Sequence, residues 1–345
     1  MTSARRLLVP LGFAVLLVAG IVVSARVGQL PVSGSDVLGA ALHGLGIANP
    51  WTPADHVVEQ TLLQIRFPRL AMSILVGALL AVAGTVMQAV FGNPLAEPGV
   101  VGVSSGAALG AAAAIAFAGG LLGGWGVAVF AFAGGLVTTL LVYTTARSGG
   151  RTEVVTLLLT GIAVNAFAGA GLALVMFLSD TGSREQIVFW QLGSMNASRW
   201  SEVAVVAGFG VPAAVVALVL ARRYDLLALG ERTAAHLGLR VERLRVGSIV
   251  LVALLTGVAV AFTGIIQFVG LVVPHLTRML LGPAHRPLLG VSLLGGAALM
   301  VWADLLARTL VAGADLPIGM LTALVGGPFF FWLVRSTRAR AGGWA

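Results

Sequence analysis

Long apolar runs separated by short polar segments make up most of the chain. These runs lie at about 7–25, 67–91, 98–117, 127–145, 154–178, 201–220, 246–268, 288–310 and 317–334, and a shorter helix is expected within 267–282. Of the segments between them, 26–65 is expected to be a mixed loop, 119–126 a glycine-rich turn, and 179–200 a loop with a short helix across 186–192. A helix needs roughly 20 apolar residues to cross a bilayer, so this pattern predicts about ten transmembrane helices. The sequence therefore predicts an all-α polytopic membrane protein with a single transmembrane domain.

The polar segment 92–99 separates the second apolar run, 67–91, from the third, 98–117. Its sequence is Gly-Asn-Pro-Leu-Ala-Glu-Pro-Gly. Its backbone groups cannot remain unpaired against lipid, so it lies at an interface or lines a cavity inside the protein. One interpretation is a gate, in which Asn93 supplies a polar tip, Leu95 an apolar plug, and the two prolines restrict the turn. From these residues alone, an ordinary turn between two helices is favoured over a gate.

The apolar runs 67–91 and 246–268 are similar to each other. Each follows an arginine-bearing segment, contains a glycine (Gly84 and Gly264) and ends at a proline-containing break before a short helix. Five crossings separate them, so two halves, at about 67–178 and 246–334, would have opposite orientations. Inverted repeats with broken helices at their interface are a recurrent plan of transporters.

Composition excludes several classes of protein. The chain is 58% hydrophobic and 10% charged, whereas soluble proteins carry about 25% charged residues. Cysteine is absent, and no cluster of His, Asp and Glu resembles a metal site, so no metal or cofactor is expected. Lysine is also absent, and a phosphate-binding loop of the G-x-x-x-x-G-K-[ST] type requires it. If ATP drives the protein, another polypeptide hydrolyses it.

The distribution of arginine predicts the topology. We place Arg5 and Arg6 in the cytoplasm and retain the first apolar run as a helix rather than a cleaved signal. Fifteen of the 21 arginines then lie on the cytoplasmic side and six outside. Because cytoplasmic loops are enriched in arginine, this bias predicts that both termini are cytoplasmic. The net charge of +8 follows from the same bias and does not require nucleic acid.

The segment 221–245 carries six arginines among leucines and small residues. It is too long for a turn and too basic for lipid. We interpret it as a cytoplasmic helical platform that receives a motor subunit. An amphipathic segment lying on anionic lipid is the alternative.

Arg66, Arg69 and Arg308 lie on the outer side, against the charge bias. Each could extend to lipid headgroups, or the three could receive acidic side chains of a docking partner. Asp304 precedes Arg308 by four residues, so we favour a structural ion pair over a buried functional acid. His275 follows Pro274, and we interpret it as a backbone cap rather than a ligand.

Residues 102–106 match G-x-S-x-G, a pattern of serine hydrolases. An intramembrane serine hydrolase with His275 as the base is therefore one alternative function. We favour a helix-packing face of small residues, because no strand-to-helix turn is available here. An ion-coupled secondary transporter is a second alternative, but it needs intramembrane acids, of which Asp304 is the obvious one.

Several sequence strings, in order along the chain from residue 66, resemble the FecCD/BtuC-type permease family, the membrane subunits of type II ABC importers for iron chelates, haem and vitamin B12. They are RFPR (66–69), GNPLAEPGVVGVSSGAALG (92–110), FWQLGSM (189–195), LGERTAAHLGLRVERLR (229–245), FVGLVVPHLTRMLLGPAHR (268–286), ADLLARTL (303–310) and LPIGMLTALVGGPFFFWLVR (316–335). The resemblance implies a BtuC-like fold with pseudo-inverted halves, located in the bacterial cytoplasmic (inner) membrane. It also implies a homodimer with two ATP-binding subunits and an extracytoplasmic substrate-binding protein.

The resemblance also assigns roles to particular residues. It implies that Arg66, Arg69 and Arg308 receive acidic residues of the binding protein. Asn93 and Leu95 correspond to a cytoplasmic gate, and Val154 and Val155 stand where the family tends to have hydroxyl-bearing gate residues. The residues implied to contact the ATPase subunit are Leu229, Gly230, Glu231, Ala234 and Gly238. The implied function is a permease, without a nucleotide site of its own, that imports haem or a ferric siderophore, with cobalamin as the alternative.

Overall fold

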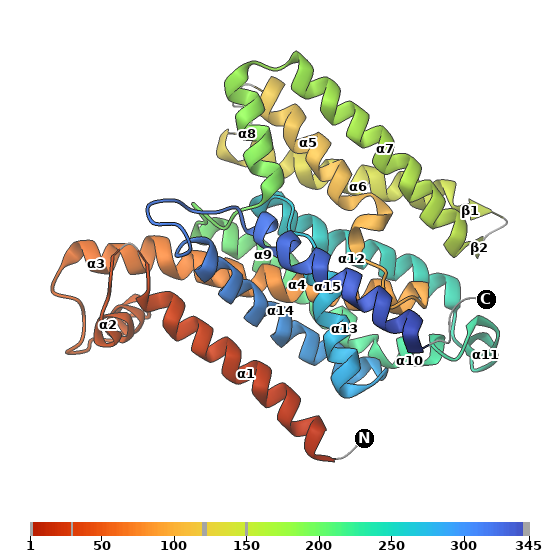
Figure 1. The fold of residues 1–345 in the computed structure, drawn as a ribbon, viewed down its shortest axis with the longest axis horizontal. Coiled ribbons are helices and arrows are strands. Elements are labelled where there is room, and N and C mark those ends of the chain that lie inside the picture. The colour runs from red at the N-terminus through yellow and green to blue at the C-terminus, as the bar shows by residue number, and fades with distance from the viewer. Residues whose placement is uncertain (1–2, 29, 119–122, 149–150, 341–345) are drawn as a thin grey trace.

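The computed structural model describes residues 3–28, 30–118, 123–148 and 151–340, and nearly all of its regular structure is helical (Figure 1). The helices are α1 Ser3–Arg26, α2 Gly34–Gly44, α3 His56–Gln60, α4 Phe67–Phe91, α5 Val103–Phe117, α6 Gly126–Thr145, α7 Val154–Leu178, α8 Thr181–Leu192, α9 Trp200–Val219, α10 Ala221–Leu227, α11 Glu231–His236, α12 Val241–Thr263, α13 Val269–Leu281, α14 His285–Ala307 and α15 Ile318–Arg340. A π-helix, Thr61–Arg66, joins α3 to α4, and 3₁₀ turns cover Pro98–Val101 and Gly123–Trp125. Strands β1 (Arg147–Ser148) and β2 (Arg151–Thr152) form an antiparallel hairpin between α6 and α7.

Seven helical segments in the described residues are long and apolar enough to span a bilayer, and three shorter apolar helices, Val103–Phe117, Val269–Leu281 and Ile318–Leu333, accompany them. Together they confirm the prediction of an all-α polytopic protein with about ten membrane helices. The predicted turn at 119–126 lies partly outside the described residues.

Helices α4 and α12 form the centre of the molecule. About 78% of the apolar window of α4 and 72% of that of α12 is buried, against 11% for α1 and 22% for α7. Small residues allow this close packing: a Cβ at Gly84 would overlap the carbonyl of Gly270 in α13, and a Cβ at Gly77 would overlap that of Gly296 in α14. In Figure 1, α5 to α8 form a group beside this centre.

The two central helices end in similar ways. Gly92 follows α4 with φ 58°, and Gly264 follows α12 with φ 70°, a region of backbone space that favours glycine. Each is followed by an irregular segment and then by a short helix, α5 or α13. Both runs thus end at a break before a short helix, as predicted, but Gly264 lies after α12 and corresponds to Gly92 rather than to Gly84.

The structure corrects several predicted boundaries. Residues 26–65, expected to be a mixed loop, contain α2, α3 and the π-helix. Two N-caps stabilise them: Ser33 Oγ accepts a hydrogen bond from Asp36 N, and Asp55 Oδ1 accepts one from Val57 N. Helix α8 begins at Thr181, before the expected 186, because Asp180 caps it.

The second half shows corrections of the same kind. Helix α12 begins at Val241 rather than 246 and ends at Thr263 rather than 268. Leu244 and Arg245 are buried in its first turns, so this part of the expected polar platform belongs to a packed helix. Helix α14 covers His285–Ala307 instead of 288–310.

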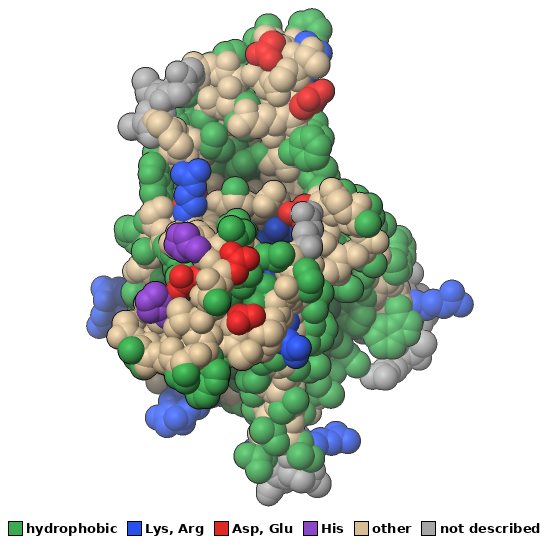
Figure 2. Space-filling model, turned by 90° about the vertical axis from the view of Figure 1, so that its left-hand side faces the viewer, with side chains coloured by type: hydrophobic (Ala, Val, Ile, Leu, Met, Phe, Trp, Pro, Cys, Tyr) green, Lys and Arg blue, Asp and Glu red, His purple; other side chains and the backbone are tan. Residues whose placement is uncertain are grey.

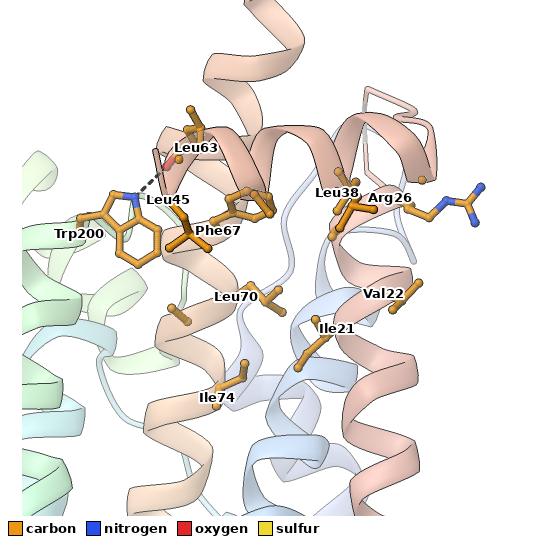
Figure 3. A pocket seen from close by; sticks show the side chains of 16 residues that line it. Ile21, Val22, Arg26, Leu38, Leu45, Leu63, Phe67, Leu70, Ile74 and Trp200 are labelled. Atoms are coloured by element: carbon orange, nitrogen blue, oxygen red, sulfur yellow. Dashed lines mark hydrogen bonds between the residues drawn. The ribbon is translucent and has the colours of Figure 1, made fainter. Parts of the chain in front are cut away.

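An apolar groove of about 700 Å³ lies between α1 and α4 at the end covered by α2 and the π-helix (Figure 3). Ile21, Leu38, Leu70 and Ile74 are among the side chains that line it. Trp200 Nε1 donates a hydrogen bond to the carbonyl of Leu63 at 2.8 Å, which ties the start of α9 to the π-helix beside the groove.

Candidate transport and docking sites

A cluster of arginines joins the ends of α1, α4 and α14. Arg66, at the end of the π-helix, is 8% exposed, and its Nη1 donates to the carbonyls of Ala25 at 2.7 Å and Arg26 at 3.2 Å. Its Nη2 donates to the carbonyl of Leu30. Arg66 thus satisfies carbonyls at the C-terminus of α1, where an α-helix leaves its last carbonyls without partners.

The second and third arginines of this cluster share a buried acid. Arg69 Nε lies 2.8 Å from Asp304 Oδ1, and Arg69 Nη1 lies 2.9 Å from Asp315 Oδ2. Arg308 Nε lies 3.6 Å from Asp304 Oδ2. Arg308 also donates to the carbonyl of Val27 at 2.7 Å and to Ser24 Oγ at 2.7 Å, so it too holds the end of α1.

Asp304 therefore has the contacts of a structural ion-pair partner, as favoured from the sequence. Its closer partner, however, is Arg69 rather than the expected Arg308. The two residues lie 235 positions apart, and no local pattern in the chain could have paired them. The sequence analysis also missed Asp315, an acid in the turn before α15.

The structure thus brings Arg66, Arg69 and Arg308 together, but it buries them against carbonyls and aspartates rather than presenting them as free cations. Three arginines face two aspartates, and Arg66 has no acidic partner in the described part of the chain. The same end of the molecule carries the acids and histidines of α2 and α3, which Figure 2 views face-on.

The predicted gate turn is held by its own asparagine. Asn93 Oδ1 accepts a hydrogen bond from Leu95 N at 2.9 Å, and the Asn93 carbonyl accepts one from Ala96 N at 3.1 Å. Asn93 is exposed and Leu95 is half-buried. Burial raises the pKa of Glu97, two residues further along the same segment, because its charged form loses hydration.

A cavity of about 330 Å³ lies where the end of α4, the start of α7 and the α10–α11 turn meet. Gly92 and Val154 line it together with Gly230 and Glu231. One predicted gate residue, Val154, therefore adjoins two predicted coupling residues. The other gate residues, Asn93, Leu95 and Val155, do not line this cavity, and Val155 is 68% exposed.

Arg245 connects the platform to the start of α7, a role that the sequence analysis missed. It is 4% exposed, it pairs with Glu231 of α11, and its Nη1 donates to the carbonyl of Thr152 at 2.8 Å. Glu242, one turn earlier in α12, accepts from Thr152 Oγ1 at 2.6 Å. Helices α11 and α12 and the hairpin before Val154 are thus linked by charged hydrogen bonds, which are stronger than neutral ones.

The remaining predicted coupling residues lie around α11. Leu229 is 59% exposed, whereas Ala234 is fully buried. Gly230 (φ 96°) and Gly238 (φ 85°) flank the helix in conformations that favour glycine. Tyr224 of α10 connects this helix to α12, because its hydroxyl lies 2.9 Å from Ser248 Oγ. Burial raises the pKa of Tyr224 to about 12.

The interpretation of His275 as a backbone cap is wrong. His275 lies inside α13, and its buried Nδ1 has no hydrogen-bond partner among the described residues. The pattern G-x-S-x-G forms the start of α5 instead of a strand-to-helix turn. A Cβ at Gly106 would overlap Thr138 of α6, so this stretch packs one helix on another. No hydrogen bond in the described residues joins Ser104 to His275, and no group of three or more His, Asp or Glu there could hold a metal.

Comparison with known proteins identifies the family. The model of the FecCD transport family matches residues 16–336. The hemin transport system permease protein HmuU of Yersinia pestis is 42% identical over 284 residues, covering 81% of this chain and 85% of that protein. The cobalamin import system permease protein BtuC of Halobacterium salinarum is 38% identical to this chain. The alignment includes 98% of this chain and 99% of that protein.

A solved structure agrees with this assignment. A metal-chelate type ABC transporter in an inward-facing conformation superposes with a TM-score of 0.82 at 34% identity, over 95% of this chain and 98% of that one. The family's members are membrane permeases and not ATPases themselves. The chain therefore belongs to the FecCD transport family and is the permease subunit of an ABC importer.

Proposed function

We propose that two copies of this chain form the transport path of an ATP-driven importer for an iron chelate, either haem or a ferric siderophore. Two ATP-binding subunits supply the energy, and an extracytoplasmic binding protein delivers the substrate. The proposal rests on the cavity that Val154, Gly230 and Glu231 line together. In this cavity a predicted gate residue lies beside two residues predicted to contact the ATP-binding subunit.

The coupling path is proposed from the same contacts. Leu229, Gly230, Glu231, Ala234 and Gly238 form the surface that an ATP-binding subunit displaces. Arg245 passes this displacement to Thr152 and so to Val154 and Val155 at the start of α7. Asn93 and Leu95 form the facing side of the gate. We propose that the platform, both termini and the gate lie on the cytoplasmic side of a bacterial inner membrane.

The docking site is proposed at the opposite end, around Arg66, Arg69 and Arg308. Arg66 has carbonyl oxygens as its acceptors and no acid, so an acidic side chain of the binding protein would be a stronger partner for it. Arg69 and Arg308 already have Asp304 and Asp315 near them. These two arginines position the ends of α1, α4 and α14, which form the surface that the binding protein contacts.

The substrate is proposed from the resemblance to haem and iron-chelate permeases, in agreement with the 42% identity to a hemin permease. The relative named for cobalamin import matches the chain over a greater length, so cobalamin is the second candidate. A binding assay of the cognate binding protein with haem, ferric siderophores and cobalamin distinguishes these substrates.

The decisive experiment is reconstitution in liposomes. We expect uptake of the substrate to require ATP, the ATP-binding subunits and the loaded binding protein together. The permease alone, given substrate and a proton or sodium gradient, should accumulate nothing. Concentrative uptake by the permease alone would instead identify an ion-coupled transporter and would refute the proposal. The pairing of Asp304 with two arginines argues against that alternative, because it leaves this buried acid without a free position for an ion.

Docking is tested with Arg66→Gln, measured as binding of the loaded binding protein to the reconstituted complex. Glutamine keeps a donor for the carbonyls of α1 but removes the charge. We expect weaker docking with an unchanged basal ATPase rate. Exposed Arg199→Gln is the control, and equal docking by both variants would exclude Arg66 from the interface.

A further inference from the structure

A cleft of about 600 Å³ lies between α10, the turn after α11 and the first turns of α12. Three arginines line it, one from α10 and two from the start of α12: Arg223, Arg240 and Arg243. Leucines, among them Leu226, Leu239 and Leu244, form its apolar wall. The cleft is separate from the gate cavity, and it shares one residue, Gly238, with the proposed ATPase-contacting surface.

The three arginines are unpaired cations. All three are exposed, and no side chain among them has a hydrogen bond or an ion pair within the described residues. The neighbouring acids are engaged elsewhere: Asp225 with His285, Glu231 with Arg245, and Glu242 with Thr152. Among the described residues no acidic side chain lines the cleft, so its charge is strongly positive and suits an anion.

The depth of the cleft places it at the membrane surface. The apolar span of α9 ends at Val219 and that of α12 begins at Val241, and the two helices pack side by side. On α12, Arg243, Gly247 and Val250 follow one another at helical spacing on one exposed face. Along this face the side chains change from basic at Arg243 to apolar at Val250. A phospholipid has the same order, from its polar headgroup to its apolar acyl chains.

We propose that this cleft binds the headgroup of an anionic phospholipid in the leaflet on the platform side, with the acyl chains along α9 and α12. Basic pockets between membrane helices at this level are suited to such headgroups. The leucine wall and the continuous apolar face of the helices favour a lipid over an acidic side chain of a protein partner. The lipid would hold α10 and the start of α12 at the membrane surface beside the ATPase-contacting helix α11.

Quenching of a fluorophore in lipid nanodiscs tests the proposal. The chain has no cysteine, and Val250 is 50% exposed, so Val250→Cys provides a single labelling site one turn below the cleft. The labelled permease, in complex with its ATP-binding subunits, is titrated with spin-labelled phosphatidylglycerol or spin-labelled phosphatidylcholine. Three arginines near the surface should favour the anionic lipid by a factor on the order of 100.

Three matched variants identify the source of this preference. Replacing Arg223, Arg240 and Arg243 by Gln should abolish it, whereas replacing all three by Lys should retain it. The control replaces three exposed arginines on the same side, Arg222, Arg286 and Arg335, by Gln, which removes the same charge outside the cleft. The control should quench like the unmodified complex.

Three results would overturn the proposal. Equal quenching by both lipids in the unmodified complex would show that the cleft does not select an anionic lipid. A preference that persists in the Gln variant of the cleft would place the lipid elsewhere. Loss of the ATP-binding subunits from the purified Gln variant, with the control still assembled, would assign the arginines to a protein interface instead.

Discussion

At the scale of single residues, Asp304 is the acid on which the arginine cluster depends. Its side chain is 2% exposed and contacts Arg69 at 2.8 Å and Arg308 at 3.6 Å. A buried charge is costly unless it is paired, and removing one partner leaves the others without compensation. The stability of this end of the molecule therefore rests on one carboxylate more than on any of the three arginines.

We predict that Asp304→Asn lowers the free energy of unfolding by about 3–5 kcal/mol, the usual cost of breaking a buried ion pair. Thermal unfolding of the purified permease in detergent measures this. Asp315→Asn is the matched control: the Asp315 side chain is 26% exposed, so its pair with Arg69 should contribute about 1 kcal/mol or less. Equal losses in the two variants would contradict the special role of Asp304.

Glu97 gives a prediction about pH. Burial raises the pKa of Glu97 above its usual value of 4.5, so the folded state binds more protons than the unfolded state in the window above that value. The free energy of unfolding should therefore fall as the pH rises through the raised pKa. Glu97→Gln should remove this dependence, so that the variant gains stability relative to the natural protein as the pH increases.

Melting curves of both proteins over a pH series check this sign. The control is Glu185→Gln, which removes an exposed carboxylate of α8 without an ion pair in the described residues. It should shift the curves by the same small amount at every pH. A constant difference for Glu97→Gln as well would show that its carboxyl is hydrated in the folded protein.

At the scale of the elements, glycines set how closely the central helices approach. Gly77 of α4 and Gly296 of α14 face each other so closely that a Cβ on either would overlap the carbonyl oxygen of the other. The backbone cannot move away locally as a long side chain could. Membrane helices associate through such contacts because lipid supplies no hydrophobic force between them.

We predict that Gly296→Ala destabilises the permease by about 1–3 kcal/mol or more, through overpacking. Gly290→Ala lies in the same helix, and its Cβ would have nothing within 4 Å. That control should be neutral or stabilising by about 0.5–1 kcal/mol, because alanine favours the helix over glycine. The melting temperatures of the two variants, measured in one detergent, should move in opposite directions. An equal shift in both would show that α4 and α14 can move apart to accommodate the added Cβ.

At the scale of the whole molecule, Arg245 and Glu242 connect the segment 221–245 to the hairpin before α7. Arg245 belongs to α12, pairs with Glu231 of α11, and donates to the carbonyl of Thr152 in the hairpin. Three segments that are separate in the sequence thus share one buried guanidinium, so a displacement of α11 has a direct path to Val154.

We predict that Arg245→Gln separates ATP hydrolysis from transport. Hydrogen bonds to charged groups are each worth about 1.5–3 kcal/mol, and 1.4 kcal/mol is a factor of ten, so uptake per ATP should fall about tenfold or more. ATP hydrolysis by the complex should continue. Transport and phosphate release in the same liposomes measure the ratio, and exposed Arg286→Gln of α14 is the control. An unchanged ratio for Arg245→Gln would remove Arg245 from the coupling path.

The broad architecture was predictable because its signals are local. Runs of apolar residues indicate membrane helices wherever they occur, and the polar break at 92–99 was recognisable by its prolines. The short helices α2 and α3 were missed, although Ser33 and Asp55 are recognisable N-caps. The start of α12 was misplaced because the sequence does not reveal that Arg245, a charged residue, is buried.

For the candidate sites, too, some features could be predicted from the sequence and others could not. Their residue types and positions could be read from the chain, since the strings around Arg66, Asn93 and Gly230 resemble those of a known family. Their contacts could not. Arg69 and Asp304 lie 235 positions apart, and Arg245 and Thr152 lie 93 apart, so only packing brings them within hydrogen-bonding distance.

By itself, then, the sequence determined that this is a multi-helix membrane protein without a standard lysine-bearing phosphate-binding loop, because hydropathy and the absence of lysine are properties of the chain alone. The tertiary structure decided that Arg66, Arg69 and Arg308 hold the end of α1 or contact Asp304, that Arg245 joins α11 to the hairpin before α7, and that three arginines whose side chains have no partner in the described residues share one cleft. These features depend on which helices lie side by side, and that is set by the close fit of small residues across the whole molecule.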